Sequence, residues 1–114
     1  MIEALRSALG PANVRTSAAE LGVYRRDASN MRGSAAVVCL PETTEQVQAC
    51  VAVANRHGVP FVARGSGTGL AGGAVPPDGA IVIVTTRMDR VLSVDPVNRL
   101  AWVQPGVLNL DLSR

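Results

Sequence analysis

The chain has 114 residues, enough for one small domain and too few for two. Apolar residues make up 47% of it, which is in the globular range, and the net charge is only +2, with arginines scattered along the chain. Aromatic residues account for 3%, so a surface that stacks single-stranded nucleic acid is not expected.

The N-terminus lacks a signal-peptide pattern, because charged residues interrupt its first turn. No apolar run reaches the ~20 residues that span a bilayer, so no transmembrane segment is expected. Cys39 and Cys50 lie in apolar stretches without a CxxC spacing. This placement favours two buried thiols in a reducing compartment, and we expect a cytoplasmic protein.

The first part of the chain is predicted to be helical and then irregular. Residues 2–9 have the spacing of a short amphipathic helix that ends at Gly10-Pro11, and a second helical turn is expected over 17–21. The polar stretch 24–34, which includes Arg25-Arg26-Asp27, has no period and is predicted to be a solvated loop. We therefore treat residues 1–34 as an N-terminal helical and loop segment.

A strand-helix-strand unit follows. Residues 35–40 form a valine-rich run that ends at Pro41, a pattern typical of a strand buried on both faces. Thr43 and Gln46 fit a capping box for the next helix, and residues 59–63 are predicted to be a second strand. Such a unit implies two parallel strands joined by a right-handed crossover, and hence an α/β (α+β) fold with a mixed sheet.

The remaining predicted elements are a buried strand over 80–85, a hairpin of 91–94 and 100–103, a turn at Pro105-Gly106 and a helix that begins at 107. Trp102 lies in the hairpin and is expected to pack against other residues. The sequence stops at Arg114 without a closing strand. We therefore expect residues 35–114 to be the N-terminal part of a truncated domain, with an exposed apolar patch where the missing half would pack.

A glycine-rich loop follows the second strand. Residues 64–73 are Arg-Gly-Ser-Gly-Thr-Gly-Leu-Ala-Gly-Gly. Glycines let a backbone approach a ligand, and successive N–H groups in such a turn form a nest for an anion. Ser66 and Thr68 add hydroxyl donors, and Arg64 adds a charge directed at a phosphate or at a nearby carboxylate. The loop predicts a phosphate or diphosphate ligand; the alternative is a tight connection, which needs fewer glycines.

Two familiar phosphate motifs do not fit this loop. The spacing Gly67-x-Gly69-x-x-Gly72 matches the dinucleotide fingerprint, but prolines at 76–77 exclude the helix that this fingerprint must open. A P-loop requires a Gly-Lys-Ser/Thr ending, which the chain lacks. Asp89 is therefore interpreted as a turn residue or an ion-pair partner of Arg87 or Arg90, and not as a ribose-binding acid.

The order of these motifs resembles the vanillyl-alcohol oxidase type of flavoprotein, whose cofactor module is the PCMH-type FAD-binding domain. The resemblance covers residues 24–114, and several motifs carry it: the strand ending at Pro41, the capped helix, the glycine-rich loop, the hairpin with Asp95-Pro96, and Pro105-Gly106. Within this family, the Thr-Gly-Leu-Ala-Gly-Gly ending and residues 109–113 look most like the FAD subunit of glycolate oxidase. The D-lactate and D-2-hydroxyacid dehydrogenases are close behind.

The resemblance implies a small subdomain packed against a larger one, with FAD between them. It also implies an enzyme that oxidises a small 2-hydroxy acid, of the glycolate or D-lactate type, to the 2-oxo acid. Companion subunits, or the missing C-terminal half, would be its partners and would provide any attachment to the inner membrane. The backbone of 65–70 would bind the pyrophosphate, with Pro41 near the adenine. The implied cofactor-binding residues are Pro41, Arg64, Gly65, Ser66, Gly67, Thr68, Gly69, Leu70, Gly73 and Gly106.

Two departures from the family pattern shape these expectations. Some relatives carry a histidine in the loop that links covalently to the flavin, whereas Thr68 occupies that stretch here, so we expect non-covalent FAD. His57 ends the preceding helix and is interpreted as a helix-terminal residue. No catalytic base can be named, and no metal cluster is expected. Two alternatives are an inactive truncated or split-gene fragment, and a phosphate-ligand module that binds AMP or ADP as well as FAD.

Overall fold

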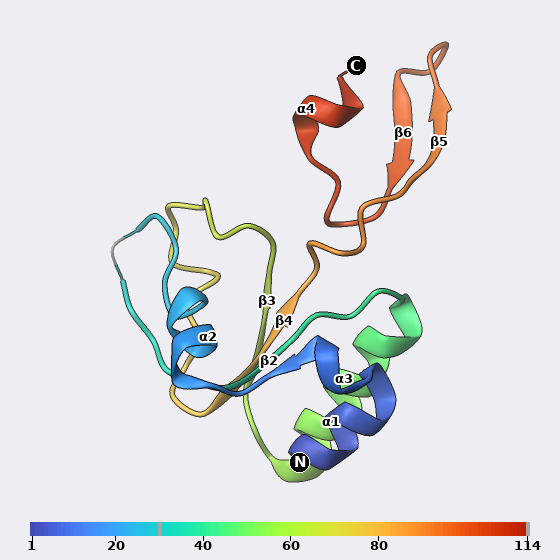
Figure 1. Ribbon diagram of the computed structural model, residues 1–114. Coiled ribbons are helices and arrows are strands. Elements are labelled where there is room, and N and C mark those ends of the chain that lie inside the picture. The colour runs from blue at the N-terminus through green and yellow to red at the C-terminus, as the bar shows by residue number, and fades with distance from the viewer. Residues whose placement is uncertain (30, 114) are drawn as a thin grey trace.

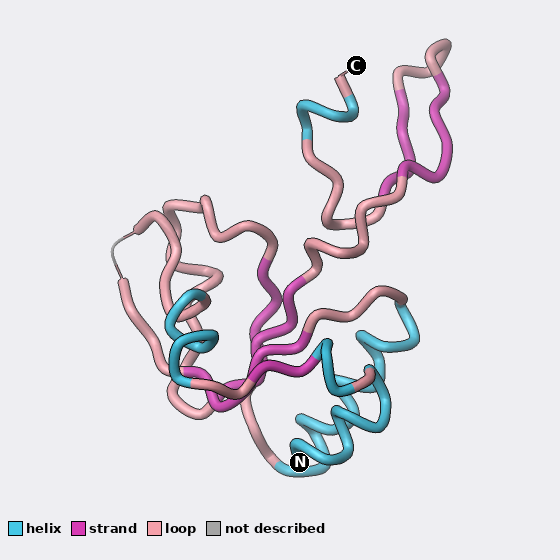
Figure 2. Tube along the Cα trace, viewed as in Figure 1, coloured by secondary structure: helices cyan, strands magenta, loops and turns pink. Residues whose placement is uncertain are grey.

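The computed structural model describes residues 1–29 and 31–113. Figures 1 and 2 show a sheet with helices against it, and a separate hairpin and short helix that extend from it. In chain order the elements are α1 (Ile2–Leu9), a 3-10 turn (Pro11–Asn13), β1 (Val14–Arg15), α2 (Ala18–Val23), β2 (Ala35–Cys39), α3 (Thr44–His57), β3 (Phe61–Arg64), β4 (Ala80–Val84), β5 (Val91–Asp95), β6 (Leu100–Val103) and α4 (Asn109–Leu112).

The main sheet is mixed, as the sequence predicts. Its strand order is β1-β2-β4-β3, with β4 parallel to both of its neighbours and β1 antiparallel to β2. The predicted strand-helix-strand unit is present as β2, α3 and β3. However, β4 lies between the two strands, so they are parallel but not adjacent. The sequence does not determine this order, because each strand pairs with residues far along the chain.

Both faces of the main sheet are covered by helices. On one face, α1 and α3 pack over Val37, Cys39, Ile81 and Ile83. On the other face, residues of α2 and the segment after it pack over the alternate side chains, Val38, Leu40, Val82 and Val84. This two-sided burial explains why β2 and β4 are continuous apolar runs and not alternating ones. Both cysteines are buried and free, as expected.

The ends of α3 follow the sequence signals. The Thr43 hydroxyl accepts a hydrogen bond from the Gln46 amide at 3.1 Å. The Gln46 side chain accepts one from the Glu42 amide at 2.7 Å, one residue before the N-cap. Gly58 ends the helix in the left-handed region, at φ 61°, where glycine is favoured. The N-cap at Thr43 and the stop at Gly58 are therefore confirmed, whereas the return bond of Gln46 goes to the amide before the N-cap and not to that of Thr43.

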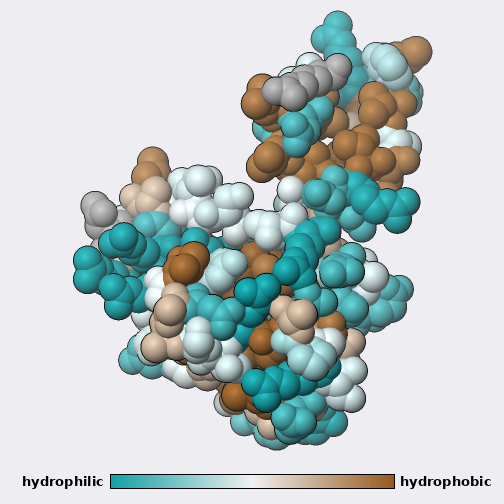
Figure 3. All heavy atoms as spheres, viewed as in Figure 1, coloured by the Kyte–Doolittle hydropathy of each residue, from teal (hydrophilic) through white to brown (hydrophobic). Residues whose placement is uncertain are grey.

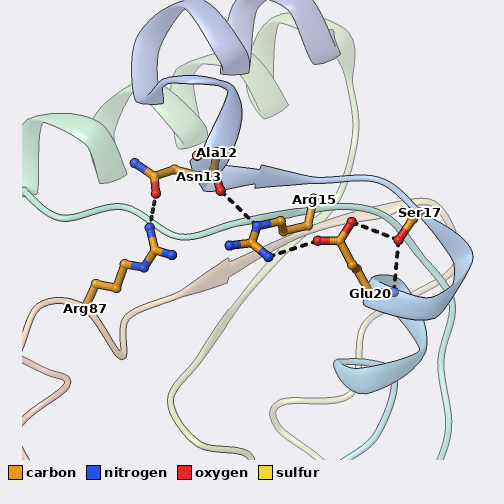
Figure 4. A network of polar contacts seen from close by, with 6 residues as sticks. All are labelled: Ala12, Asn13, Arg15, Ser17, Glu20 and Arg87. Carbon is orange, nitrogen blue, oxygen red and sulfur yellow. Dashed lines mark hydrogen bonds and ion pairs between the residues drawn. The ribbon is translucent and has the colours of Figure 1, made fainter.

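The N-terminal residues join the sheet through β1, a strand that the sequence pattern does not predict. The two residues of β1 pair with β2, with Val14 opposite Cys39. Polar contacts support this connection (Figure 4): Arg15 donates to the Ala12 carbonyl at 2.9 Å and to Glu20 at 3.0 Å. A two-residue strand is too short to show a period, so only the pairing partner reveals it.

The hairpin of β5 and β6 and the following α4 present apolar side chains to the surface. The brown surface at the upper right of Figure 3 covers these elements. Trp102 is 72% exposed, so the expectation that it packs against other residues is wrong within the described chain, because no second layer faces the hairpin there. The exposed apolar side chains of this region include Leu92, Val94, Leu100, Trp102, Leu108 and Leu110. None of the helices described has the length and apolar character to cross a membrane.

The packing of α1 leads to a stability prediction. Leu5 is fully buried against α3 and the sheet, so Leu5→Ala leaves a cavity and lowers the free energy of unfolding by about 2–5 kcal/mol. Urea unfolding followed by circular dichroism measures the loss. Val23→Ala is the control, because Val23 is exposed and its change is expected to stay within about 0.5 kcal/mol. Equal stability of the two variants would show that α1 is not part of the core.

Candidate functional site

The glycine-rich loop lies where β3 and β4 end side by side. Arg64 pairs with Val84 at the last position of the parallel ladder, and the Thr85 amide donates to the Arg64 carbonyl at 2.8 Å. In open α/β sheets, ligands bind beyond the carboxyl ends of the strands. The loop that leaves β3 and the residues that follow β4 therefore occupy the edge where a ligand is expected.

A cavity of about 260 Å³ brings together residues from separate parts of the chain. Ser66 from the loop and Gly106 from the turn after β6 both line it, and both are among the residues predicted to bind the cofactor. Asp89 lines it too. Its suggested ion-pair partner Arg87 instead lies 3.8 Å from Glu42 and also contacts Asn13 (Figure 4).

The backbone N–H groups of the loop are available to a ligand. Most residues between 65 and 71 are exposed, and within the described residues no acceptor is assigned to their amides. Ser66, Thr68 and Leu70 are all exposed, and Ser66 also lines the cavity. Unpaired, successive N–H donors next to a cavity form the kind of nest that binds a phosphate or diphosphate.

Three loop glycines have no structural requirement for glycine. At Gly65, Gly69 and Gly73, a β-carbon would meet nothing within 4 Å among the described residues, and none of the three has a positive φ. Because these three residues have no side chain, a ligand can reach the loop backbone from solvent. This is what a diphosphate such as that of FAD requires, because a β-carbon would hold it away from the amides.

Two other predicted site glycines are required by packing. A β-carbon on Gly67 would overlap the Arg64 guanidinium, and Gly67 has φ +75°. A β-carbon on Gly106 would overlap the carbonyls of Thr85 and Met88, and its amide already donates to Met88 at 2.8 Å. Gly106 therefore lies at the cavity through its close backbone packing, and its N–H is not free for a ligand.

Arg64 lies beneath the loop with only 8% of its surface exposed. Its guanidinium donates to the carbonyls of Arg26 at 2.6 Å and Tyr24 at 3.3 Å, and its Cζ lies 5.3 Å from the centre of the Tyr24 ring. The sequence suggested a phosphate or a carboxylate as its partner. Among the described residues its partners are backbone carbonyls and not a carboxylate, and the phosphate stays a prediction. Carbonyls do not neutralise a formal charge, so the guanidinium still adds a positive field under the loop.

Other predicted or dismissed residues lie elsewhere. Pro41 is fully buried at the end of β2 and does not line the cavity. Asp27 was expected to be solvated, but it is only 8% exposed, so that interpretation is wrong. The spacing of Asp27 and Ser29, which allows the carboxylate to accept from the backbone two residues on, could have signalled an ordered turn.

Comparison with known proteins relates this chain to a family of FAD-binding domains. The profile of a family described as an FAD binding domain matches residues 35–114. Glycolate oxidase subunit GlcD of Bacillus subtilis is 38% identical over 113 residues, which are 98% of this chain and 24% of that protein. D-2-hydroxyglutarate dehydrogenase of Stutzerimonas stutzeri is 33% identical over 115 residues, covering 100% of this chain and 25% of that protein. The chain thus spans about a quarter of the length of these curated relatives.

Solved structures show the same fold. The structure of p-cresol methylhydroxylase matches with a TM-score of 0.86 and 25% identity, over 98% of this chain and 23% of that one. Alkyldihydroxyacetonephosphate synthase matches with a TM-score of 0.84 and 20% identity, over 97% of this chain and 23% of that one. The expected fold, a PCMH-type FAD-binding domain, is therefore confirmed.

The two kinds of loop glycine lead to a paired prediction. Gly67→Ala places a β-carbon in the left-handed region and against Arg64, so the free energy of unfolding falls by at least about 1–2 kcal/mol. Gly69→Ala fills open space, leaves stability within about 0.5 kcal/mol and weakens binding of inorganic diphosphate. Urea unfolding and calorimetric titration measure these effects. Diphosphate binding by Gly69→Ala as tight as that of the unmodified protein would place the ligand elsewhere.

Proposed function

Because this chain belongs to the family of FAD binding domains, we propose that it is the FAD-binding part of a flavoprotein that oxidises a 2-hydroxy acid to the 2-oxo acid. FAD is the cofactor of this family, and it supplies the hydride acceptor when bound. The observation that carries the proposal is the largely exposed run 65–71, whose amides have no assigned acceptor among the described residues and whose Ser66 lines the cavity with Gly106.

The proposed work of these residues is to bind the diphosphate and hold it in place. The amides of 65–71 would donate hydrogen bonds to its oxygens, and the hydroxyls of Ser66 and Thr68 would add donors. Arg64 would contribute through its positive charge near Gly67, while its guanidinium donates to the carbonyls of Tyr24 and Arg26. Open backbone at Gly65, Gly69 and Gly73 lets the diphosphate approach closely.

The substrate class and the cellular setting are parts of the same proposal. Relatives named glycolate oxidase and D-lactate dehydrogenase support a small 2-hydroxy acid as the substrate. We place the acid-binding residues, the catalytic base and the electron-accepting partner on polypeptide beyond these 114 residues. The free thiols of Cys39 and Cys50 support a reducing compartment such as the cytoplasm, with any inner-membrane attachment made through partner subunits.

We expect the flavin to be bound without a covalent link. The loop offers hydroxyls and no imidazole or thiol, and His57 ends α3, which leads to the amino end of β3, away from the loop. Acid precipitation of the full protein is therefore expected to release all of its flavin into the supernatant. Flavin fluorescence that migrates with the denatured polypeptide would contradict this arrangement.

The substrate class is tested by flavin reduction in the full protein. Glycolate or D-lactate, added without oxygen, is expected to bleach the absorbance of the bound flavin. Propionate is the matched control, because it lacks the hydroxyl that is oxidised. A protein that binds FAD but is bleached by neither hydroxy acid keeps the cofactor assignment and loses the substrate assignment. Equal affinity for ADP and FAD, without bleaching, would instead favour a nucleotide-binding module.

A further inference from the structure

A segment that precedes the matched family range lies directly against the glycine-rich loop. In Figure 1, the chain between α2 and β2 runs beside the connection from β3 to β4. The Ala28 amide donates to the Gly69 carbonyl at 3.0 Å. Further along, a β-carbon on Gly72 would lie 2.8 Å from the Met31 sulfur, so the two stretches are in close contact there too. The loop is therefore shaped partly by residues of the N-terminal segment.

The Arg64 guanidinium lies between this segment and the loop. Its Nη1 donates to the carbonyls of Arg26 at 2.6 Å and Tyr24 at 3.3 Å, and its Cζ lies 5.3 Å from the centre of the Tyr24 ring. On the loop side, a β-carbon on Gly67 would overlap Nη2. One side chain thus contacts the backbone of both stretches, and the loop can come this close to it only with glycine at position 67.

The burial of this guanidinium is not offset by a countercharge. Arg64 is 8% exposed, and no salt bridge joins it to a carboxylate among the described residues. Its Nε is buried and has no hydrogen-bond partner in the same part of the chain. A buried charge with an unused donor lowers stability. An apolar side chain would fill this space without that cost, so the guanidinium indicates a role beyond core packing.

We propose that Arg64 is a positioning residue, which joins the loop at Gly67 to the carbonyls of Tyr24 and Arg26 and so holds the amides of 65–71 ready for the diphosphate of FAD. The inference rests on the proposed FAD site. Its physical basis is preorganisation: a loop already held in its binding conformation loses less freedom when the ligand binds. The role requires the fixed directions of the guanidinium N–H groups as well as the positive charge, and lysine supplies only the charge.

The test compares Arg64→Lys and Arg64→Met with the unmodified full protein, stripped of flavin and titrated with FAD. Both variants lose the planar group that donates to the two carbonyls, although lysine keeps the charge. The dissociation constant for FAD is expected to rise by about ten- to a hundredfold in each, the range for lost hydrogen bonds of a charged group. Arg56→Lys is the matched control, because Arg56 is exposed near the end of α3, which leads to the amino end of β3.

A second readout separates positioning from general destabilisation. Inorganic diphosphate and adenosine are used as competitors of FAD, and the titration gives the dissociation constant of the folded fraction. Arg64→Lys is expected to weaken competition by diphosphate and to leave that by adenosine unchanged. Hydrogen exchange of the Ala28 amide is expected to become faster in the same variant, because the loop that carries its acceptor, the Gly69 carbonyl, is held less firmly.

Tyr24 provides a test that leaves Arg64 in place. Tyr24→Leu removes the ring beside the guanidinium but keeps the backbone carbonyl, and it is expected to weaken FAD binding a few-fold. Tyr24→Phe keeps the ring and is the matched control, with the FAD affinity of the unmodified protein. This pair decides the matter if the Arg64 variants do not fold, and equal FAD affinity of the two Tyr24 variants would then overturn the inference.

The outcomes separate this inference from the cofactor assignment. If the unmodified protein binds no FAD, the proposed function fails and the inference fails with it. If the unmodified protein binds FAD, and folded Arg64→Lys binds FAD and diphosphate equally tightly, the charge alone is sufficient and Arg64 has no positioning role. Equal weakening of diphosphate and adenosine also overturns the inference, because it indicates a general structural effect.

Discussion

The parallel pairing of β3 with β4 is the constraint on which the site depends. It ends with Arg64 opposite Val84, so the glycine-rich loop and the residues after β4 begin at the same edge of the sheet. The cavity lined by Ser66, Asp89 and Gly106 follows from this arrangement. The pairing is stable because helices cover both faces of the sheet, and the apolar side chains of β4 are removed from water on each side.

Two buried charged residues, Arg64 and Asp27, lie in or near the glycine-rich loop. The Arg64 guanidinium lies below Gly67 and donates to two carbonyls, and the Asp27 carboxylate accepts from the Ser29 amide at 2.8 Å. Burial makes such groups costly unless they are hydrogen-bonded. Both residues are held by, or belong to, the stretch between α2 and β2. The binding loop and the N-terminal segment are therefore one structural unit.

The family match gives FAD as the cofactor, and the geometry of the glycine-rich loop supports the proposed diphosphate site. A diphosphate needs backbone that it can approach and donors that are not already used, and within the described residues the loop offers both between 65 and 71. The exposed apolar side chains of β5, β6 and α4 lie beyond this edge of the sheet. In the proposed function the redox chemistry belongs to the flavin, and the role proposed for these residues is to bind and orient it.

The sequence by itself determined the features that depend on neighbouring residues. The N-cap at Thr43, the buried strands and the hairpin follow from local pattern, because turn, cap and burial preferences act over a few residues. The same kind of local pattern predicts an anion ligand at the glycine-rich loop. The tertiary structure decided the position of β4 between β2 and β3, the pairing of β1, the carbonyl partners of Arg64, the exposure of Trp102 and the burial of Asp27. These features depend on contacts between residues far apart along the chain, and no local pattern records which distant residues will meet.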